Sequence, residues 1–120
     1  MNSAATTPGA DRFTAEMRHA LTDAVGRALA PSAVLPRAEA VEDLTERLRS
    51  FVTRLVPHVE DRARRMDHGT AEWHQARSAL SETRRVLGAG PGTGLRSAVG
   101  HMQDLGRVCH RLRCHLPLDA

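Results

Sequence analysis

Apolar residues recur every three or four positions along most of the chain, which is the spacing of one face of an α-helix. The first such segment extends to Leu29 and ends before Pro31, because proline cannot continue a helix without the loss of a backbone hydrogen bond. We expect Thr14 to cap its N-terminus, since a threonine hydroxyl can accept a hydrogen bond from a free backbone N–H of the first turn. The apolar positions of this segment are Phe13, Met17, Leu21, Ala24, Val25, Ala28 and Leu29.

The second segment begins at Pro36, which suits the first helical position because its missing N–H would have no helical partner there. Pro57 lies inside this segment, where a proline removes one hydrogen bond and clashes with the preceding turn, so we expect a kink or a restart. The helix then continues to about Met66, and residues 67–69 form a turn. The apolar stripe consists of Val41, Leu44, Leu48, Phe51, Val52, Leu55, Val56 and Val59.

The third segment starts with Thr70 as its expected cap and ends at residues 88–94, which hold four glycines and one proline. Its predicted buried positions are Trp73, Ala76, Leu80, Thr83 and Leu87. We expect Trp73 to be the one large ring of the core, because aromatic side chains strongly favour burial. The fourth segment runs from Leu95 to about His115, with an apolar side formed by Leu95, Ala98, Val99, Met102, Leu105, Cys109, Leu112 and Leu116.

These elements predict an all-α fold, an antiparallel four-helix bundle whose second helix is kinked at Pro57, because no strand-like alternation is present and the connections are short. We expect residues 11–120 to form a single domain, since a chain of this length fits one core. Residues 1–10 are small and polar apart from the initiator, which predicts a disordered tail. A monomer and a homodimer are equally compatible with an apolar stripe on every helix.

Composition adds an aliphatic core and an uneven charge to this picture. Aromatic residues make up 2% of the chain, so Leu, Val and Ala must fill the interior. The net charge is +3, but residues 84–120 carry six arginines against two aspartates, so the positive excess lies in the last third. No long apolar run or secretory signal is present, which excludes a membrane span and favours a cytoplasmic location.

The C-terminal helix contains the weak candidates for a metal site. His110 and Cys114 are four residues apart and share a helix face, so they supply two ligands, whereas a closed zinc site needs four. Cys109 belongs to the apolar stripe, where a free cysteine behaves as a small hydrophobic residue. A disulfide between the two cysteines is disfavoured because their side chains diverge on a helix. We therefore expect no metal and no cofactor.

A basic end on the same helix makes nucleic-acid binding an alternative to weigh, because phosphate attraction needs only clustered positive charge. Its residues are Arg107, Arg111 and Arg113, together with His110. Most other arginines follow an acid four residues earlier, as ordinary solvated helix pairs do. Those pairs are Asp23 with Arg27, Asp43 with Arg47, Glu60 with Arg64, and Asp61 with Arg65. Since base-stacking aromatics and a helix-turn-helix spacing are both missing, nucleic acid is the less favoured partner.

Residues 88–94 could bind an anion at the N-terminus of the last helix, with help from Arg96, but the chain has no lysine for a nucleotide-binding loop. A structural turn is the preferred interpretation. Catalysis is disfavoured because the adjacent pairs Asp67-His68 and Cys109-His110 do not hold a base against a reacting group. The chain is therefore predicted not to be an enzyme.

A dense polar cluster lies beside the glycine-rich segment, where we expect the third and fourth helices to meet. It consists of Arg77, Glu82, Arg84 and Arg85. Such charge runs usually mark solvated helix faces, so pairing within the bundle is favoured over a partner site.

Two stretches of the chain resemble a known family. They are Leu48-Arg49 with Leu55-Val56-Pro57 and Val59-Glu60, and then Ala76-Arg77-Ser78-Ala79-Leu80 with Glu82-Thr83-Arg84-Arg85, Leu87 and Ser97-Ala98. On these residues the part from Leu48 to His115 resembles a family of small proteins of unknown function, common in high-GC bacteria and associated with natural-product biosynthesis. The resemblance implies an accessory or regulatory role and supplies no active-site residues.

The leading functional hypothesis is a noncatalytic helical accessory or regulatory protein that presents a surface to a protein partner or to a second copy. A small DNA-binding regulator that uses the basic C-terminal helix is the first alternative. A metal- or small-ligand-binding bundle is the second.

Overall fold

The computed structural model describes residues 14–32 and 34–117, and these form four α-helices. They are α2 (Ala15–Leu29), α3 (Ala38–Arg65), α4 (Ala71–Ala89) and α5 (Leu95–Cys114). No strand occurs within this part of the chain, so the predicted all-α class with four helices is confirmed. The expected disordered tail over residues 1–10 and the apolar position Phe13 lie outside the described residues.

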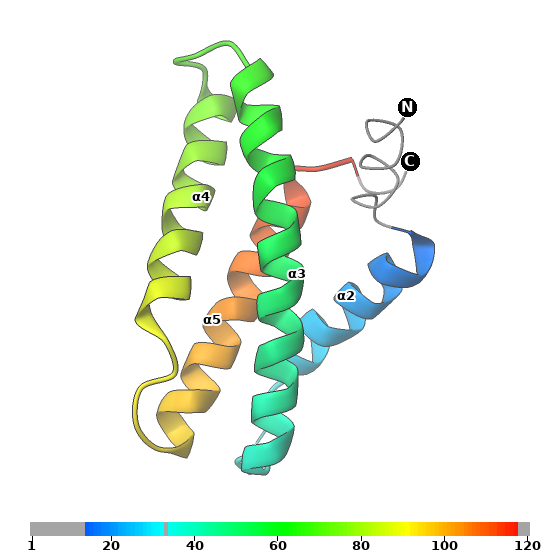
Figure 1. Cartoon of the computed structure of the whole chain (residues 1–120), viewed down its shortest axis with the longest axis vertical. Coiled ribbons are helices and arrows are strands. Elements are labelled where there is room, and N and C mark those ends of the chain that lie inside the picture. The colour runs from blue at the N-terminus through cyan, green and yellow to red at the C-terminus, as the bar shows by residue number, and fades with distance from the viewer. Residues whose placement is uncertain (1–13, 33, 118–120) are drawn as a thin grey trace, which may run out of the picture.

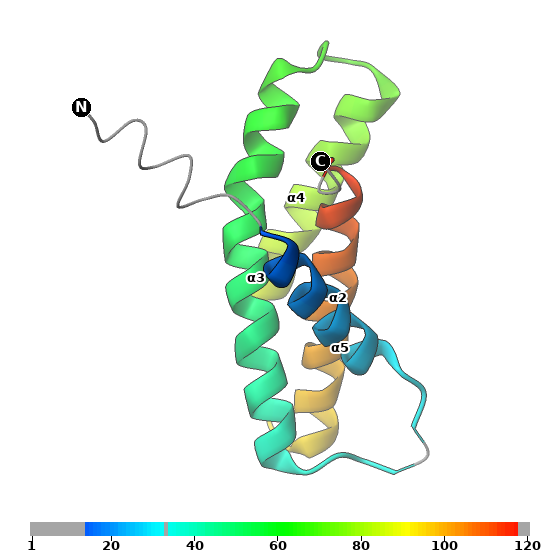
Figure 2. The same cartoon turned by 90° about the vertical axis from the view of Figure 1, so that its right-hand side faces the viewer.

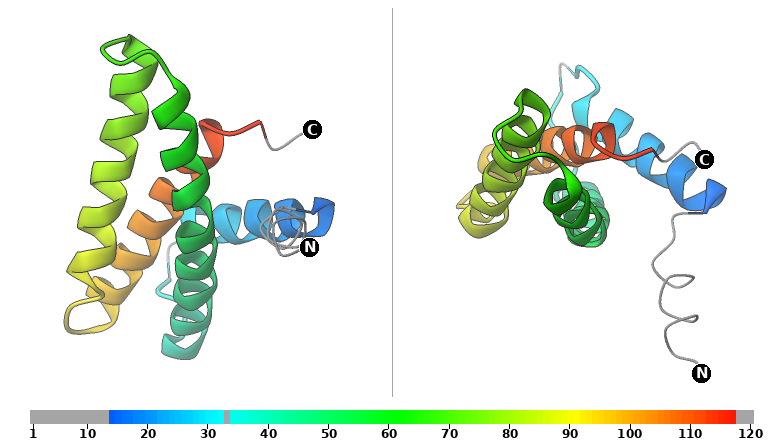
Figure 3. Two further views of the ribbon diagram at one scale, coloured as in Figure 1. Left: turned by 45° about the horizontal axis from the view of Figure 1, so that its top comes forward. Right: turned by 90° about the horizontal axis from the view of Figure 1, so that it is seen from above.

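Helices α3, α4 and α5 run side by side in alternating directions, while α2 crosses α3 and α5 obliquely (Figures 1 and 3). The turn of residues 66–70 and the loop of residues 90–94 are short, which makes the helices that they join antiparallel neighbours. Residues 30–32 and 34–37 lie in the longer connection between α2 and α3, visible in Figure 2, and this length allows α2 to take a different direction. Both α3 and α5 pack against every other helix, so they form the centre of the bundle.

Threonine hydroxyls cap two of the helices as the sequence predicts. The Thr14 Oγ1 accepts a hydrogen bond from the backbone N–H of Met17 at 3.1 Å, and the Thr70 Oγ1 accepts one from Trp73 at 3.2 Å. The predicted start of α3 at Pro36 is wrong, because Arg37 has an extended backbone with ψ 148° and the helix begins at Ala38. Arg37 makes no side-chain cap, so the start of α3 lacks the capped backbone N–H that Thr14 and Thr70 provide at α2 and α4.

Proline 57 lies within α3 without ending it. The helix is continuous from Ala38 to Arg65, so the alternative of a restart at Pro57 is wrong. Proline removes only one hydrogen bond, whereas Leu55 and Val59 on either side are fully buried in one core. Continuity of this buried face therefore outweighs the lost bond.

The predicted end of α4 at Gly88 is also wrong, since the helix extends through Gly88 to Ala89. A glycine in the last turn costs about 1 kcal/mol relative to alanine, which the packing of a helix can offset. The helix ends where Gly90 takes a positive φ of 72°, a conformation that glycine adopts without a steric penalty.

The core is aliphatic, as the composition predicts, and its buried side chains form one cluster. Its largest fully buried members include Leu21, Leu48, Leu55, Leu105 and Leu112. Trp73 is only half-buried, so its predicted place in the core is wrong. It lies in the first turn of α4 next to the α3–α4 turn, where the ring centroids of His74 and exposed His68 are 4.9 and 5.0 Å from its own.

Two polar side chains are buried in the described part of the chain. The Thr83 hydroxyl donates to the carbonyl oxygen of Ala79 at 2.7 Å, and the His101 Nε2 lies 3.3 Å from a guanidinium nitrogen of Arg49. Burial, followed by the charge of Arg49, lowers the pKa of His101 from its ordinary value. None of the described helices combines the length and the low polarity that crossing a membrane requires.

Candidate functional site

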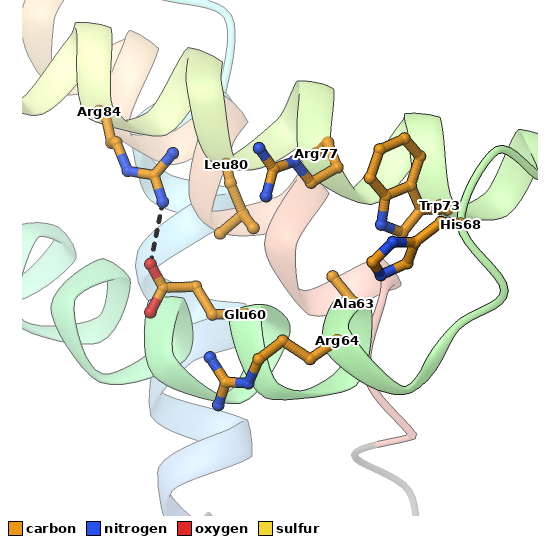
Figure 4. Close-up of a pocket in the computed structure, with 8 residues that line it drawn as sticks. All are labelled: Glu60, Ala63, Arg64, His68, Trp73, Arg77, Leu80 and Arg84. Atoms are coloured by element: carbon orange, nitrogen blue, oxygen red, sulfur yellow. Dashed lines mark hydrogen bonds and ion pairs between the residues drawn. The ribbon is translucent and has the colours of Figure 1, made fainter.

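The end of α3, the turn after it and residues 73–84 of α4 enclose a cleft of about 300 Å³, which we call the α3–α4 cleft (Figure 4). Its lining consists of Glu60, Ala63, Arg64, His68, Trp73, Arg77, Leu80 and Arg84. Residues 60 and 64 are one turn apart on α3, and residues 73, 77, 80 and 84 are spaced by three or four on α4. These spacings bring each set onto one helix face.

Buried Ala63 and Leu80 give the cleft an apolar floor. At one end the rings of His68 and Trp73 stack with centroids 5.0 Å apart and planes inclined by 26°. The guanidinium carbon of Arg77 lies 5.6 Å from the centroid of Trp73, within the range of a cation–π interaction. The cleft therefore combines an apolar floor with an aromatic wall.

The lining of the cleft carries more positive than negative groups. Three guanidinium groups and one carboxylate line it. A guanidinium nitrogen of Arg84 lies 2.9 Å from a Glu60 carboxylate oxygen, which joins α4 to α3, and Arg64 pairs with Asp61 at 3.3 Å. Arg77 forms no ion pair with any residue that the structure describes.

The structure divides the predicted polar cluster between two sides of α4. Arg77 and Arg84 line the α3–α4 cleft. Glu82 and Arg85 lie outside the cleft, where a nitrogen of Arg85 is 2.6 Å from a carboxylate oxygen of Glu82. The hydrogen bond from Arg85 lowers the pKa of Glu82, and the same bond raises the pKa of Arg85. Successive residues point about 100° apart on a helix, so neighbours such as Arg84 and Arg85 must contact different surroundings.

Two of the four predicted helix pairs form, namely Asp23 with Arg27 at 3.9 Å and Asp61 with Arg65 at 2.7 Å. The prediction for Glu60 is wrong, because its carboxylate pairs with Arg84 on α4 rather than with Arg64. Among the described ion pairs none joins Asp43 to Arg47.

The basic residues of the C-terminal helix do not share one face. Arg107 pairs with Asp104 at 2.7 Å, and Arg111 donates to the hydroxyl oxygen of Ser78 on α4 at 3.4 Å. Arg113 follows Arg111 by two residues, which turns its side chain about 200° away around the helix. A single basic surface for a nucleic acid is therefore not assembled by these three residues.

The structure brings together the weak metal candidates, since the Cys114 Sγ lies 3.7 Å from the His110 Nε2. Within residues 14–32 and 34–117, no group of three or more His, Cys, Asp or Glu side chains is placed to hold a metal ion. Cys109 is fully buried, and burial raises the pKa of its thiol to about 12. Both cysteines are free thiols, as expected from their divergent directions.

The glycine loop is built as a structural turn. The Ser97 hydroxyl donates to the carbonyl oxygen of Pro91 at 2.7 Å, which ties the start of α5 back to the loop. Gly92 has a positive φ of 70°, and a Cβ there would collide with the Ser97 hydroxyl.

A second hollow surface was missed by the sequence reasoning. The α2–α3 connection and the first half of α5 enclose a groove of about 670 Å³, which we call the α2–α5 groove. It contains the exposed large hydrophobic residues of the described chain, with exposed fractions of 38% for Leu29, 76% for Val34 and 43% for Leu35. The available signal was Val34-Leu35 itself, an apolar pair within a proline-bounded connection.

The rim of the groove carries positive charge only. Arg27 and Arg96 line it, and no acidic residue does. Arg27 already pairs loosely with Asp23 at 3.9 Å, while Arg96 makes no ion pair with the residues described.

Comparison with known proteins identifies a family for the chain. The model described as "Family of unknown function (DUF6415)" matches residues 19–120. No curated protein and no solved structure matches the chain. The match confirms the resemblance to a family of unknown function and extends it beyond the stretch from Leu48 to His115. Because the match covers most of its length, the chain belongs to this family, DUF6415.

Proposed function

We propose that the chain is a noncatalytic interaction protein that docks a protein partner in the α2–α5 groove. The observation that carries this proposal is the position of Leu29, Val34 and Leu35, which are exposed together in one groove. Single exposed hydrophobic residues are normal on a protein surface, whereas a gathered apolar patch with a polar rim is typical of interaction sites.

The chemistry of the rim specifies the partner. Arg27 and Arg96 stand beside the apolar side chains without a lining carboxylate. Complementary charge steers encounters and rejects wrong partners. The groove therefore fits an amphipathic segment of another protein that carries apolar anchors flanked by aspartate or glutamate.

The remaining details of the role are part of the same proposal. The resemblance over Leu48 to His115 supports an accessory or regulatory task in natural-product biosynthesis, and we propose the cytoplasm as its location. The DNA-binding alternative receives less support, because Arg107 and Arg111 are engaged by Asp104 and Ser78 and Arg113 points elsewhere.

Tagged protein purified from cells of the source organism tests this proposal, with Val34→Asp as the disruptive variant. Ala40→Asp is the matched control, since residue 40 is an exposed position on α3 outside the groove. We expect a copurifying protein that is lost with Val34→Asp, is kept with Ala40→Asp, and binds through an apolar segment with acidic flanks. Circular dichroism of both variants verifies that they fold.

Three results overturn the proposal. The first is a set of copurifying proteins that does not change with Val34→Asp. The second is a captured segment that lacks acidic flanks. The third is a wild-type homodimer that Val34→Asp dissociates, since the occupant of the groove is then a second copy of the chain.

A further inference from the structure

The α3–α4 cleft has a chemistry that the proposed docking function does not use. We propose that this cleft binds a small organic anion, a molecule with a carboxylate or phosphate head on a flat apolar body. The proposal rests on the lining of the cleft and is independent of the α2–α5 groove.

The head of the ligand is specified by the guanidinium groups. Arg77 has no ion-pair partner within the described chain, and Arg84 shares the cleft with a single carboxylate, that of Glu60. Guanidinium groups present paired N–H donors that match the geometry of carboxylates and phosphates. An anion beside Arg77 would balance the one lining guanidinium group that has no ion-pair partner among the described residues, and it would compete with Glu60 for Arg84.

The body of the ligand is specified by the floor and the volume. Ala63 and Leu80 are buried beneath the cleft, and the paired rings of His68 and Trp73 close one end of it. A volume of about 300 Å³ is at the lower end of the range for small-molecule sites. It accommodates a ring-sized molecule and excludes a dinucleotide.

The aromatic end of the cleft is held in place before any ligand binds. The Thr70 hydroxyl donates to the carbonyl oxygen of Asp67 at 2.8 Å and accepts from the backbone N–H of Trp73 at 3.2 Å. These two bonds fix the turn that carries His68 against the helix that carries Trp73. A fixed wall loses little conformational entropy on binding, which favours affinity.

The pair of Glu60 and Arg84 gives the proposal a distinctive consequence. The Glu60 carboxylate occupies Arg84 and repels an incoming anion, so Glu60→Gln should increase affinity several-fold. Arg77→Gln should decrease affinity about tenfold, since a charge-assisted hydrogen bond contributes about that factor or more. A purely structural role for Glu60 predicts no gain in binding.

Trp73 is the only tryptophan of the chain, so its fluorescence reports on the cleft alone. The probes are benzoate and phenyl phosphate, with uncharged benzamide and inorganic phosphate as controls. We expect saturable changes with benzoate, phenyl phosphate or both, and binding of benzamide and inorganic phosphate that is at least about tenfold weaker. The stronger of the two aromatic anions identifies the head group.

Arg47→Gln is the matched control variant, because it removes an exposed arginine of α3 that lies outside the cleft. It should leave binding unchanged. The indole N–H resonance of Trp73 in an NMR titration provides a second readout that does not depend on fluorescence.

The proposal is overturned if neither readout moves saturably with either aromatic anion. It is also overturned if benzamide binds as well as benzoate, or if inorganic phosphate binds as well as phenyl phosphate. Equal losses from Arg47→Gln and Arg77→Gln would likewise contradict a specific site. None of these outcomes affects the docking proposal, whose test uses a different surface.

Discussion

Gly100 and Gly106 both lie inside α5, yet the same substitution should change stability in opposite directions at the two positions. A Cβ added at Gly100 meets no atom within 4 Å. A Cβ added at Gly106 would lie 3.1 Å from the Cβ of Ala28 and 3.4 Å from the Cδ2 of Leu29, where α2 crosses α5. The pair therefore separates backbone propensity from interhelical packing.

The expected magnitudes follow from these distances. Alanine is about 1 kcal/mol better than glycine in a helix interior, and Gly100→Ala should show this gain in full. At Gly106 the new carbon stands a few tenths of an ångström inside the ordinary contact distance to a Cβ of α2. Overpacking of this kind costs about 1–3 kcal/mol, which leaves Gly106→Ala about 1 kcal/mol less stable than the wild type.

Urea unfolding followed by far-UV circular dichroism measures both free energies of unfolding, and thermal unfolding followed in the same way gives both Tm values. We expect Tm to rise by about 4 °C for Gly100→Ala and to fall by a similar amount for Gly106→Ala. If Gly106→Ala is stabilised as much as Gly100→Ala, then α2 does not pass α5 at the observed distance. The oblique packing of α2 described above would then be incorrect.

Three further outcomes test the ionisable groups. A thiol reagent at mildly alkaline pH should modify exposed Cys114 and spare Cys109, whose thiol is buried with a pKa of about 12, and denaturant should release the second thiol. Because the pKa of His101 is lowered in the folded state, the unfolded chain binds a proton at higher pH than the folded chain does. The contribution of His101 to stability is therefore complete above about pH 6.5 and is lost as pH falls. His101→Gln should flatten this loss of stability in urea titrations at several pH values. A double-mutant cycle on Glu60 and Arg84 should give a coupling below about 1 kcal/mol, because both side chains are substantially exposed. Reaction of both thiols in the native protein would contradict the burial of Cys109. An unchanged pH profile in His101→Gln would contradict the lowered pKa of His101, and a larger coupling would contradict the exposed character of the Glu60–Arg84 pair.

The features predicted correctly from the sequence are local. Thr14 and Thr70 cap helices through groups three residues away, and the apolar stripes depend on spacing within a single helix. The errors arise where a contact distant in sequence or a neighbouring turn determines whether a helix continues or a side chain is buried. Pro57 does not end α3, because buried residues on both sides belong to one core, and Trp73 finds a ring partner in the adjacent turn instead of a place inside.

The candidate sites were predicted less well for the same physical reason. Arg77 and Arg84 were singled out as part of a polar cluster, but their common surface also needs Glu60 and His68, and the Arg84–Glu60 pair links positions 24 apart. No helical period connects such positions. The α2–α5 groove depends on a connection too short to show periodicity, so only the structure reveals that its apolar side chains stay exposed.

The two proposed surfaces lie toward opposite ends of the bundle, one near the α3–α4 turn and the other near the α2–α3 connection (Figures 1 and 2). Between these surfaces α3 packs against α5, and each of these helices contributes a fully buried leucine to the core, Leu48 from α3 and Leu105 from α5. Neither surface is lined by Leu48 or Leu105, and a ligand couples two sites only where it binds two states of the protein with different affinities. Saturating benzoate should therefore leave the affinity of a docked partner unchanged. A measured change of fivefold or more would require α3 or α5 to move as a unit, contrary to this packing.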